Sequence, residues 1–427
     1  MTLIRKPVTG MKDILPAEME IRDYCIGIIK KTYAEFGFQS IETPCVESIE
    51  NLTSKSGGDN EKLIFKILKR GEKLRLSEAR SEADLVDSGL RYDLTVPLVR
   101  YYSNHENELP TPFKALQMGN VWRADRPQKG RYRQFMQCDI DIIGEPTNLA
   151  EIELITATTA TLGRLGFRNF QIRINERRIL RAMAKYSGFP GERFDEVCII
   201  LDKMDKIGLD GVKEELLESG FDAESARRYL YLFEGMEKQG DSMAKLSWLE
   251  QELSGAGAIE PDVIPNLRQT IETADRVKQA EFDIVFDPTI VRGMSYYTGT
   301  IFEIRMPELG ISCGGGGRYD GMVGRFTGRD VPACGFSIGF ERIILILMEQ
   351  HFEIPGKPGR EAFLLEKDLP SDRLAEALSE ARAEREAGKD VLVVRMNKNK
   401  KFQKQQLTEQ GFTEFREFYA RPLGQES

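Results

Sequence analysis

Polar and apolar residues alternate between Phe135 and Ile143, which is typical of a β-strand with one apolar face. The polar face carries Gln137, Asp139 and Asp141. Another strand ends near Trp122, and a turn containing proline and glycine lies between the two. The pattern therefore predicts an antiparallel strand pair with carboxylates on one face.

The same patterns predict the elements around this pair. A helical period predicts helices at 17–36 and 149–163. Short apolar runs predict further strands at 38–41, 63–68, 90–101, 113–118 and 170–174.

The strands at 63–68 and 90–101 are expected to form a hairpin with a long polar connection at about 69–88. On the second of these strands, Arg91, Asp93 and Thr95 should share one face. Alternatively, Asp93 caps a helix that begins near Val96.

From Asn175 to about Gln279 the pattern is helical throughout. Helices are predicted at 178–186, 194–206, 211–219, 223–235, 241–253 and 264–277. None of them carries a group of residues with an evident chemical role. The segment is therefore predicted to be a helical insertion at 175–280.

Strand patterns return at 282–347, where four consecutive glycines, Gly314 to Gly317, interrupt the apolar alternation. Glycines inside a strand mark a bulge or the close approach of a ligand. Because Arg292 and two tyrosines lie shortly upstream, we favour a ligand wall. A glycine-spaced strand then leads into a helix whose first turn holds Glu341 and Arg342.

After a linker rich in proline and glycine at 355–359, residues 361–427 follow a β-α-β-α-β pattern, which predicts a small α/β domain. Its second helical stretch is basic. The lysines of this stretch are candidates for contact with RNA or, equally, a solvated helix face: Lys398, Lys400, Lys401 and Lys404.

Composition narrows the class of protein. A chain of 427 residues is expected to form two or three domains. The net charge of −8 disfavours non-specific coating of nucleic acid but permits a local basic surface. The six cysteines lack CxxC spacing, which argues against a zinc site and favours a cytoplasmic protein with reduced thiols. No apolar run approaches the roughly 18 residues of a membrane span.

The loop of the antiparallel pair is strongly basic. Asp125 opposes five cations, which are Arg123, Arg126, Lys129, Arg131 and Arg133. Guanidinium groups match phosphate oxygens in bidentate fashion, and the carboxylates of the following strand suit an ammonium group. We therefore expect a site for a polyphosphate and an amino acid; the alternative is a solvated basic hairpin.

The segment RADRPQKGRYRQF resembles motif 2 of class II aminoacyl-tRNA synthetases, in the form found in histidyl-tRNA synthetases. Other resemblances follow in the family's order. The helix and strand up to Pro44 resemble motif 1, LRYDLTVP the stretch that binds the amino group, VRGMSYYTGT the histidyl signature, and GFSIGFER motif 3. Ser295 stands where the family more commonly has Asp. Residues 361–427 resemble a shortened anticodon-binding domain.

The resemblance implies an α+β fold, with a class II synthetase-like antiparallel sheet flanked by helices, a helical insertion and a small C-terminal α/β domain. It implies a catalytic core in two parts, 1–174 and 281–354, around the insertion at 175–280, followed by the C-terminal domain at 361–427. The insertion would reach over the acceptor arm of tRNA, and motif 1 would form a homodimer.

The resemblance also implies the reaction. L-histidine would be activated with ATP and Mg²⁺ and passed to the 3′ end of tRNA-His. Arg123 and Arg292 would be the catalytic residues, on either side of the α-phosphate. The other ATP contacts would come from Asp125, Arg131, Tyr132, Phe135 and Arg342. Histidine would be held by Asp93, Thr95, Gln137, Asp141, Arg292, Tyr296 and Tyr297. Gln128 would join the four lysines in binding tRNA.

Three other functions fit parts of the pattern. The regulatory subunit of ATP phosphoribosyltransferase is a synthetase paralogue that typically lacks the C-terminal domain and degrades the histidyl signature. A histidine-activating ligase with another acceptor would fit the shortened C-terminal domain. A general RNA-binding module explains the lysines alone. Arg292 and the lysine-bearing domain favour the synthetase.

Overall fold

The computed structural model describes residues 3–53, 60–291, 297–308, 310 and 312–420. The described residues divide into two compact units, one from Met1–Ile14 and Arg22–Gln350, the other from Leu15–Ile21 and His351–Ser427. None of the helices in these ranges has the length and apolar character needed to cross a membrane.

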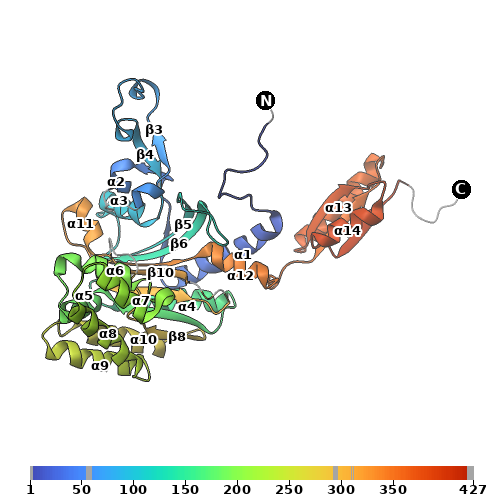
Figure 1. Ribbon diagram of the computed structural model, residues 1–427. Helices are drawn as coiled ribbons and strands as arrows, with labels where there is room; N and C mark the ends of the chain where they lie inside the picture. The colour runs from blue at the N-terminus through green and yellow to red at the C-terminus, as the bar shows by residue number, and fades with distance from the viewer. Residues whose placement is uncertain (1–2, 54–59, 292–296, 309, 311, 421–427) are drawn as a thin grey trace. The chain divides into compact units, whose positions relative to one another are not determined.

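The larger unit is built on an eight-stranded sheet of order β1-β5-β6-β11-β10-β9-β7-β8 (Figure 1). Only the outer pairs, β1 with β5 and β7 with β8, are parallel. The strands are β1 (Gln39–Ile41), β5 (Phe113–Trp122), β6 (Gln134–Ile143), β7 (Phe170–Glu176), β8 (Phe282–Phe286), β9 (Thr300–Arg305), β10 (Ser312–Arg318) and β11 (Ala333–Ile338). The predicted antiparallel pair is confirmed as β5 and β6, in which Gly119 lies opposite Gln137.

Helices cover the apolar face of β6. Cys138 on this face lies near Cys25 of α1 (Pro16–Glu35), and both thiols are buried. The end of α1 packs beside α4 (Leu149–Arg164), where Arg164 pairs with Glu35 at 2.6 Å. The opposite face of β6, with its carboxylates, is left for the site.

A second sheet of the larger unit has the order β2-β4-β3. Its elements are β2 (Val46–Ser48), α2 (Ile49–Thr53), β3 (Lys66–Leu68) and β4 (Val86–Leu90), with short 3-10 turns at Asn60–Leu63, Gly71–Lys73 and Glu82–Asp84. Strand β3 pairs antiparallel with β4, so a hairpin is present, but its second strand is Val86–Leu90, most of which lies in the expected connection at about 69–88 and not at 90–101.

The strand predicted at 90–101 is wrong. The chain leaves the sheet at Leu90, and helix α3 (Thr95–His105) begins shortly afterwards. The reason is local, because Asp93 Oδ1 accepts a hydrogen bond from the backbone N–H of Val96 at 3.0 Å and so satisfies the start of the helix. The alternative in which Asp93 caps a helix is confirmed.

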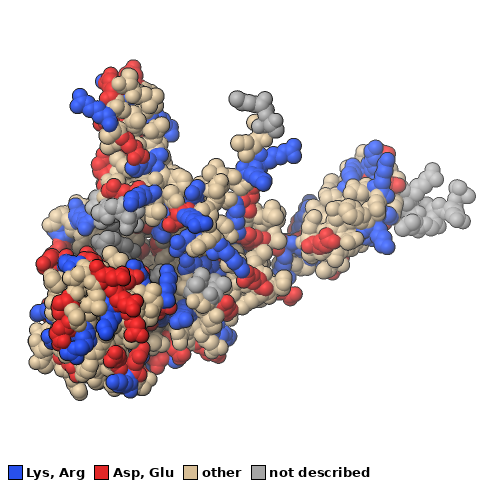
Figure 2. Space-filling model, viewed as in Figure 1, with Lys and Arg blue, Asp and Glu red and all other residues tan. Residues whose placement is uncertain are grey.

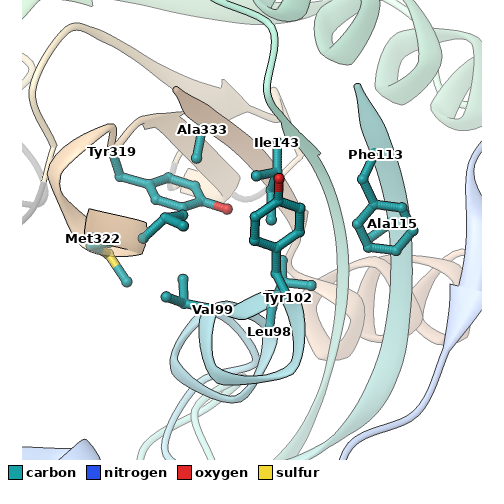
Figure 3. Packing of buried hydrophobic residues seen from close by; sticks show 10 residues of the cluster. Leu98, Val99, Tyr102, Phe113, Ala115, Ile143, Tyr319, Met322 and Ala333 are labelled. Atoms are coloured by element: carbon teal, nitrogen blue, oxygen red, sulfur yellow. The ribbon is translucent and has the colours of Figure 1, made fainter. Parts of the chain in front are cut away.

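Helix α3 packs between the strand pair and the segment around α11 (Gly321–Thr327). Figure 3 shows the ring of Tyr319 beside Met322 and Val99 in this cluster. The cluster consists of Leu98, Val99, Tyr102, Phe113, Ala115, Ile143, Tyr319, Met322, Val323 and Ala333. Tyr319 is thereby fixed from several sides.

The predicted helical segment is present and lies on one side of the sheet (Figure 1). It comprises α5 (Arg177–Ser187), a 3-10 turn at Gly191–Arg193, α6 (Phe194–Leu201), α7 (Met204–Glu218), α8 (Ala223–Glu237), α9 (Ser242–Gly255) and α10 (Val263–Arg276). The single helix predicted at 194–206 is wrong. Helix α6 stops at Leu201, and α7 bends at Gly208, whose φ of 68° does not fit a helix. Acidic and basic side chains are interspersed over these helices (Figure 2).

Helix α12 (Phe340–Glu349) follows β11 directly, as predicted for the glycine-spaced strand and helix. The smaller unit has the predicted β-α-β-α-β order. Its elements are β12 (Arg360–Leu365), α13 (Ser371–Glu386), β13 (Asp390–Arg395), α14 (Lys400–Glu409) and β14 (Glu414–Phe418). The three strands form a parallel sheet of order β13-β12-β14.

Candidate active site

A cavity of about 730 Å³ opens over the polar face of β6. Every described side chain predicted to bind ATP or histidine lines it. These are Asp93, Thr95, Arg123, Asp125, Arg131, Tyr132, Phe135, Gln137, Asp141, Tyr297 and Arg342. Arg292, Ser295 and Tyr296 lie outside the described residues.

Strand β6 separates the charges of the cavity. The basic loop ends just before Phe135, and Asp141 lies six residues further on. At about 3.3 Å per residue, the two positions are roughly 20 Å apart along the strand. The cavity therefore has a basic end and an acidic end.

At the basic end, Arg123 is held by two contacts. Its Nε donates to the carbonyl oxygen of Tyr92 at 2.8 Å, and its guanidinium lies 5.1 Å from the centre of the Phe135 ring. A planar guanidinium fixed in this way suits bidentate binding of phosphate oxygens.

The N-terminal segment holds the basic loop. The backbone N–H of Arg133 donates to the carbonyl oxygen of Gly10 at 2.7 Å, and Arg133 Nη1 donates to that of Thr9 at 3.3 Å. Lys12 Nζ lies 4.9 Å from the centre of the Tyr132 ring. The sequence pattern does not indicate this role, because these contacts join residues more than a hundred positions apart.

The start of α12 closes the basic end. Arg342 Nη1 donates to the carbonyl oxygen of Ser312. The neighbouring Glu341 also lines the cavity, and it accepts hydrogen bonds from Arg22 at 2.7 and 2.9 Å and from the backbone N–H of Met136 at 3.1 Å. Glu341 thus links α1, β6 and α12 by hydrogen bonds. No local sequence pattern predicts this role.

At the acidic end, Asp141 Oδ1 accepts a hydrogen bond from the Tyr319 hydroxyl at 2.6 Å. Gly335 lies opposite Asp141 on β11. A Cβ atom at this position would come within 2.0 Å of Asp141 Oδ1, so glycine is what leaves room for the carboxylate. The glycine spacing is visible in the sequence, whereas no pattern in the sequence predicts the role of Tyr319.

Between the two ends, Asp139 faces Ser337 on β11. The Ser337 hydroxyl donates to Asp139 Oδ1 at 2.5 Å, and Gln137 Nε2 lies 3.3 and 3.4 Å from the two carboxyl oxygens. Burial and the neighbouring Asp141 raise the pKa of Asp139 to about 8.

The segment that carries Asp93 is tied to β5. Gln117 donates from Nε2 to the carbonyl oxygen of Leu94 at 3.0 Å and accepts from Thr43 Oγ1 at 3.2 Å. Arg91 is buried beneath the segment, where it donates to the carbonyl oxygens of Thr43 and Asn120, so it does not share a face with Asp93. Gln117 and Arg91 therefore position Asp93 at the cavity wall.

Strand β10 contains the bulge that was one interpretation of the glycine run, while the ligand wall stays a prediction. The register between β9 and β10 shifts between Ser312 and Gly314, which marks a bulge, and the backbone of Gly314, Gly315 and Gly316 lines the cavity.

Ile199 of α6 also lines the cavity with a side chain that is 55% exposed.

The predicted tRNA contacts do not line the cavity. Gln128 is exposed on the β5–β6 loop. Lys400 and Lys404 pair with Glu417 at 2.8 and 2.7 Å and hold its pKa down at about 2. Lys398 and Lys401 are exposed, and no ion pair of theirs is found within the described residues.

A largely antiparallel sheet that carries an arginine loop, a carboxylate strand and a glycine-spaced strand leading into a helix defines a class II aminoacyl-tRNA synthetase. Residues 10–343 match the family model described as histidyl-tRNA synthetase. The chain belongs to the histidyl-tRNA synthetase family.

Relatives and solved structures agree with this membership. A histidine--tRNA ligase of Leifsonia xyli subsp. xyli is 44% identical over 96% of this chain and 94% of its own. The crystal structure of histidyl-tRNA synthetase from Nostoc sp. PCC 7120 has a TM-score of 0.78 at 27% identity and covers 96% of this chain and 90% of that one. A Bacillus halodurans protein described as an ATP phosphoribosyltransferase regulatory subunit/histidyl-tRNA synthetase has a TM-score of 0.77, covering 98% and 99% of the two chains; at 21% identity it shows the fold alone.

Proposed function

We propose that the protein activates L-histidine with ATP and transfers the histidyl group to the 3′ end of tRNA-His. The observation that carries this proposal is the joint lining of one cavity by separated basic and acidic groups. In the first step, the histidine carboxylate attacks the α-phosphorus of ATP and pyrophosphate leaves. In the second step, a hydroxyl of the tRNA 3′ end displaces AMP.

The chain's part in the first step is positioning and charge stabilisation. Arg123 and Arg292 hold the α-phosphate from two sides, while Arg131 and Arg342 bind the outer phosphates. The contacts that fix Arg123 support its role, since a preorganised cation need not be ordered during the reaction.

Adenine lies between Tyr132 and Phe135, and Asp125 forms a hydrogen bond near the base. Mg²⁺ enters as the complex with ATP and neutralises the remaining phosphate charge. Among the described residues, no group of three or more histidine, cysteine, aspartate or glutamate side chains could hold a metal ion by itself.

Between the two ends, Asp93, Thr95 and Gln137 hold the ammonium group of histidine. Asp141 binds the imidazole, and Tyr296 and Tyr297 close the pocket around it. A pocket whose buried polar groups pair with both ring nitrogens rejects analogues that lack them, by a factor on the order of 10⁴.

The tRNA contacts extend beyond the cavity. Gln128 reads the extra 5′ nucleotide, and the α14 lysines approach the RNA backbone. The helical insertion at 175–280 separates the two parts of the catalytic core, 1–174 and 281–354, in sequence, and it reaches over the acceptor arm. Residues 361–427 act as a shortened anticodon-binding-like domain. Two copies pair through the motif 1 segment, which sedimentation would test.

Histidine-dependent exchange of pyrophosphate into ATP, with tRNA charging measured in the same preparation, tests the proposal. We expect both activities. Exchange without charging would instead indicate a histidine-activating ligase with another acceptor. Histidine binding without exchange would favour the regulatory subunit and would remove the arginine roles.

A further inference from the structure

Two carboxylates lie side by side on the cavity floor. Asp139 and Asp141 occupy alternate positions of β6, about 7 Å apart along the strand, and their side chains face the same cavity. They are only 5% and 3% exposed. Two buried anions at this separation repel each other, and each has lost the water that would stabilise its charge.

The partners of the two carboxylates are unequal. Asp141 receives the hydroxyl of Tyr319, which is fixed in the apolar cluster of Figure 3. Asp139 receives only the neutral donors Ser337 and Gln137, and no ion pair of Asp139 is found in the described part of the chain.

The charge of Asp139 depends on the charged and titratable groups of the elements packed around it. Asp141 on β6 and Asp93 before α3 disfavour its charge, whereas Arg123 at the end of β5 favours it from a distance. Burial is the largest cause of the raised pKa, Asp141 is the second, and the Ser337 hydrogen bond opposes them. On the other elements, Gln117 and Ser337 are neutral, and burial raises the pKa values of Tyr33 and Cys138 behind the strand, so neither adds charge near pH 7.

One buried acceptor is left over. Gln137 turns Nε2 toward Asp139, and its Oε1 is buried without a hydrogen-bond partner among the described residues. A buried carbonyl oxygen normally has a donor, so its position indicates where a ligand donor belongs. A donor bound there would lie close to Asp139.

We propose that Asp139 carries a proton in the empty pocket and releases it to solvent when the ammonium group of the amino acid enters. The ammonium group would donate to Gln137 Oε1 and supply the positive charge that the ionised Asp139 needs. Asp139 is then a positioning residue, because its ionisation gives the cavity floor on β6 a negative charge that pairs with the ammonium group. This proposal rests on histidine being the substrate.

Proton release can be measured directly by titration calorimetry of L-histidine in two buffers of different ionisation enthalpy, at about pH 7.5. Free imidazole is largely neutral at this pH. We expect a large fraction of a proton to be released per histidine bound to the native protein and almost none with Asp139→Asn. Affinity for histidine should rise with pH, by up to about tenfold per unit between roughly pH 7 and 8, and this rise should be largely absent in Asp139→Asn.

Two ligand analogues identify the group that displaces the proton. L-histidinol keeps the ammonium group and should release the same fraction of a proton as histidine. Imidazolelactate carries a hydroxyl in place of the ammonium group and should release none. Equal release by both analogues would overturn the proposal.

Variants separate this role from general damage. Asp283→Asn, at an exposed carboxylate on β8, should behave as the native protein. Ser337→Ala removes the hydrogen bond that favours the anion, so the rise of affinity should move to higher pH; this variant keeps the test open if Asp139→Asn does not fold.

The outcomes also separate this proposal from the proposed function. Equal proton release by the native protein and Asp139→Asn would place the proton elsewhere and overturn the proposal. Active exchange without proton release would mean that Asp139 is already ionised in the empty pocket, and would overturn it too. If the native protein neither binds histidine nor catalyses pyrophosphate exchange, the proposed function itself is rejected.

Discussion

The basic and acidic ends of the cavity hold their charges in different ways. The arginines lie on a connection between strands, and backbone carbonyls of the N-terminal segment fasten that connection from outside the sheet. The carboxylates lie on a central strand, and Tyr319 and Ser337 hold them from within the sheet. A loop held by a few hydrogen bonds can adjust to a long phosphate chain, whereas strand positions fix the size of a pocket. We therefore expect ATP binding to depend on the contacts between the N-terminal segment and the loop. We expect amino-acid selectivity to depend on the strand positions of the sheet.

The largest expected effect is at the basic end. Arg123→Ala should lower the rate of pyrophosphate exchange by about 10²–10³-fold, because it removes a preorganised cation from the α-phosphate. The Michaelis constant for histidine should change by only a few-fold. Arg126→Ala is the matched control, since Arg126 is exposed on the same loop and does not line the cavity. Equal losses in both variants would assign the effect to the net charge of the loop.

At the acidic end, Asp141→Asn should raise the Michaelis constant for histidine by about 10²-fold and leave that for ATP unchanged, because a buried charged hydrogen bond is lost. Tyr319→Phe removes only the donor to Asp141 and should raise it by about tenfold. Tyr102→Phe is the control, because Tyr102 belongs to the same apolar cluster without this hydrogen bond to Asp141. A similar rise in the control would make the effect one of packing.

A substitution at Gly10 should disrupt the contact between the N-terminal segment and the basic loop. Its φ is +85°, and a Cβ atom there would lie 2.8 Å from side-chain carbons of Arg133 and Pro127. Gly10→Ala should therefore displace the loop and raise the Michaelis constant for ATP by about tenfold, with that for histidine unchanged. Gly240→Ala, where an added Cβ meets no atom within 4 Å, is the control. An unchanged constant for ATP would show that the N-terminal segment does not position the loop.

The chemistry of both ends could be predicted from the sequence, but their supports could not. Alternation put Gln137, Asp139 and Asp141 on one face, because a strand has a period of two residues. The same alternation failed at Asp93, because so short a run is also compatible with a helix cap.

The supports come from distant parts of the chain. Ser337 is 198 positions from Asp139, and Glu341 is 319 positions from Arg22. Local periodicity does not specify strand order, so neither partner could be assigned before β11 was placed beside β6. Ile199 carried no polar signal at all, since it is an apolar residue of an amphipathic helix.

The stability of the acidic end should depend on pH through Asp139. Its pKa is about 8 in the folded protein and 3.8 as an ordinary value, so the unfolded chain loses this proton first as pH rises. The contribution to the free energy of unfolding is complete below about pH 4 and is lost up to about pH 8, by roughly several kcal/mol at most. Asp139→Asn should therefore melt a few degrees above the native protein at pH 8 and show no such gain at pH 4. An equal difference at both pH values would mean that the asparagine stabilises by packing.

The smallest expected effect concerns a second group of cations, the α14 lysines, which looked like the arginine loop in sequence. Lys400 and Lys404 are committed to Glu417, whereas Lys398 and Lys401 are exposed without an ion pair in the described residues. If the exposed pair contacts RNA, Lys398→Ala with Lys401→Ala should weaken tRNA binding a few-fold and reduce its salt dependence by about one unit per lysine, with pyrophosphate exchange unchanged. Lys400→Ala with Lys404→Ala removes the same charge but leaves Glu417 unpaired, so it should also lower the melting temperature. Filter binding of tRNA across a salt series distinguishes the two double variants. If both double variants weaken tRNA binding equally, long-range charge is sufficient and direct contacts of Lys398 and Lys401 with RNA are not needed.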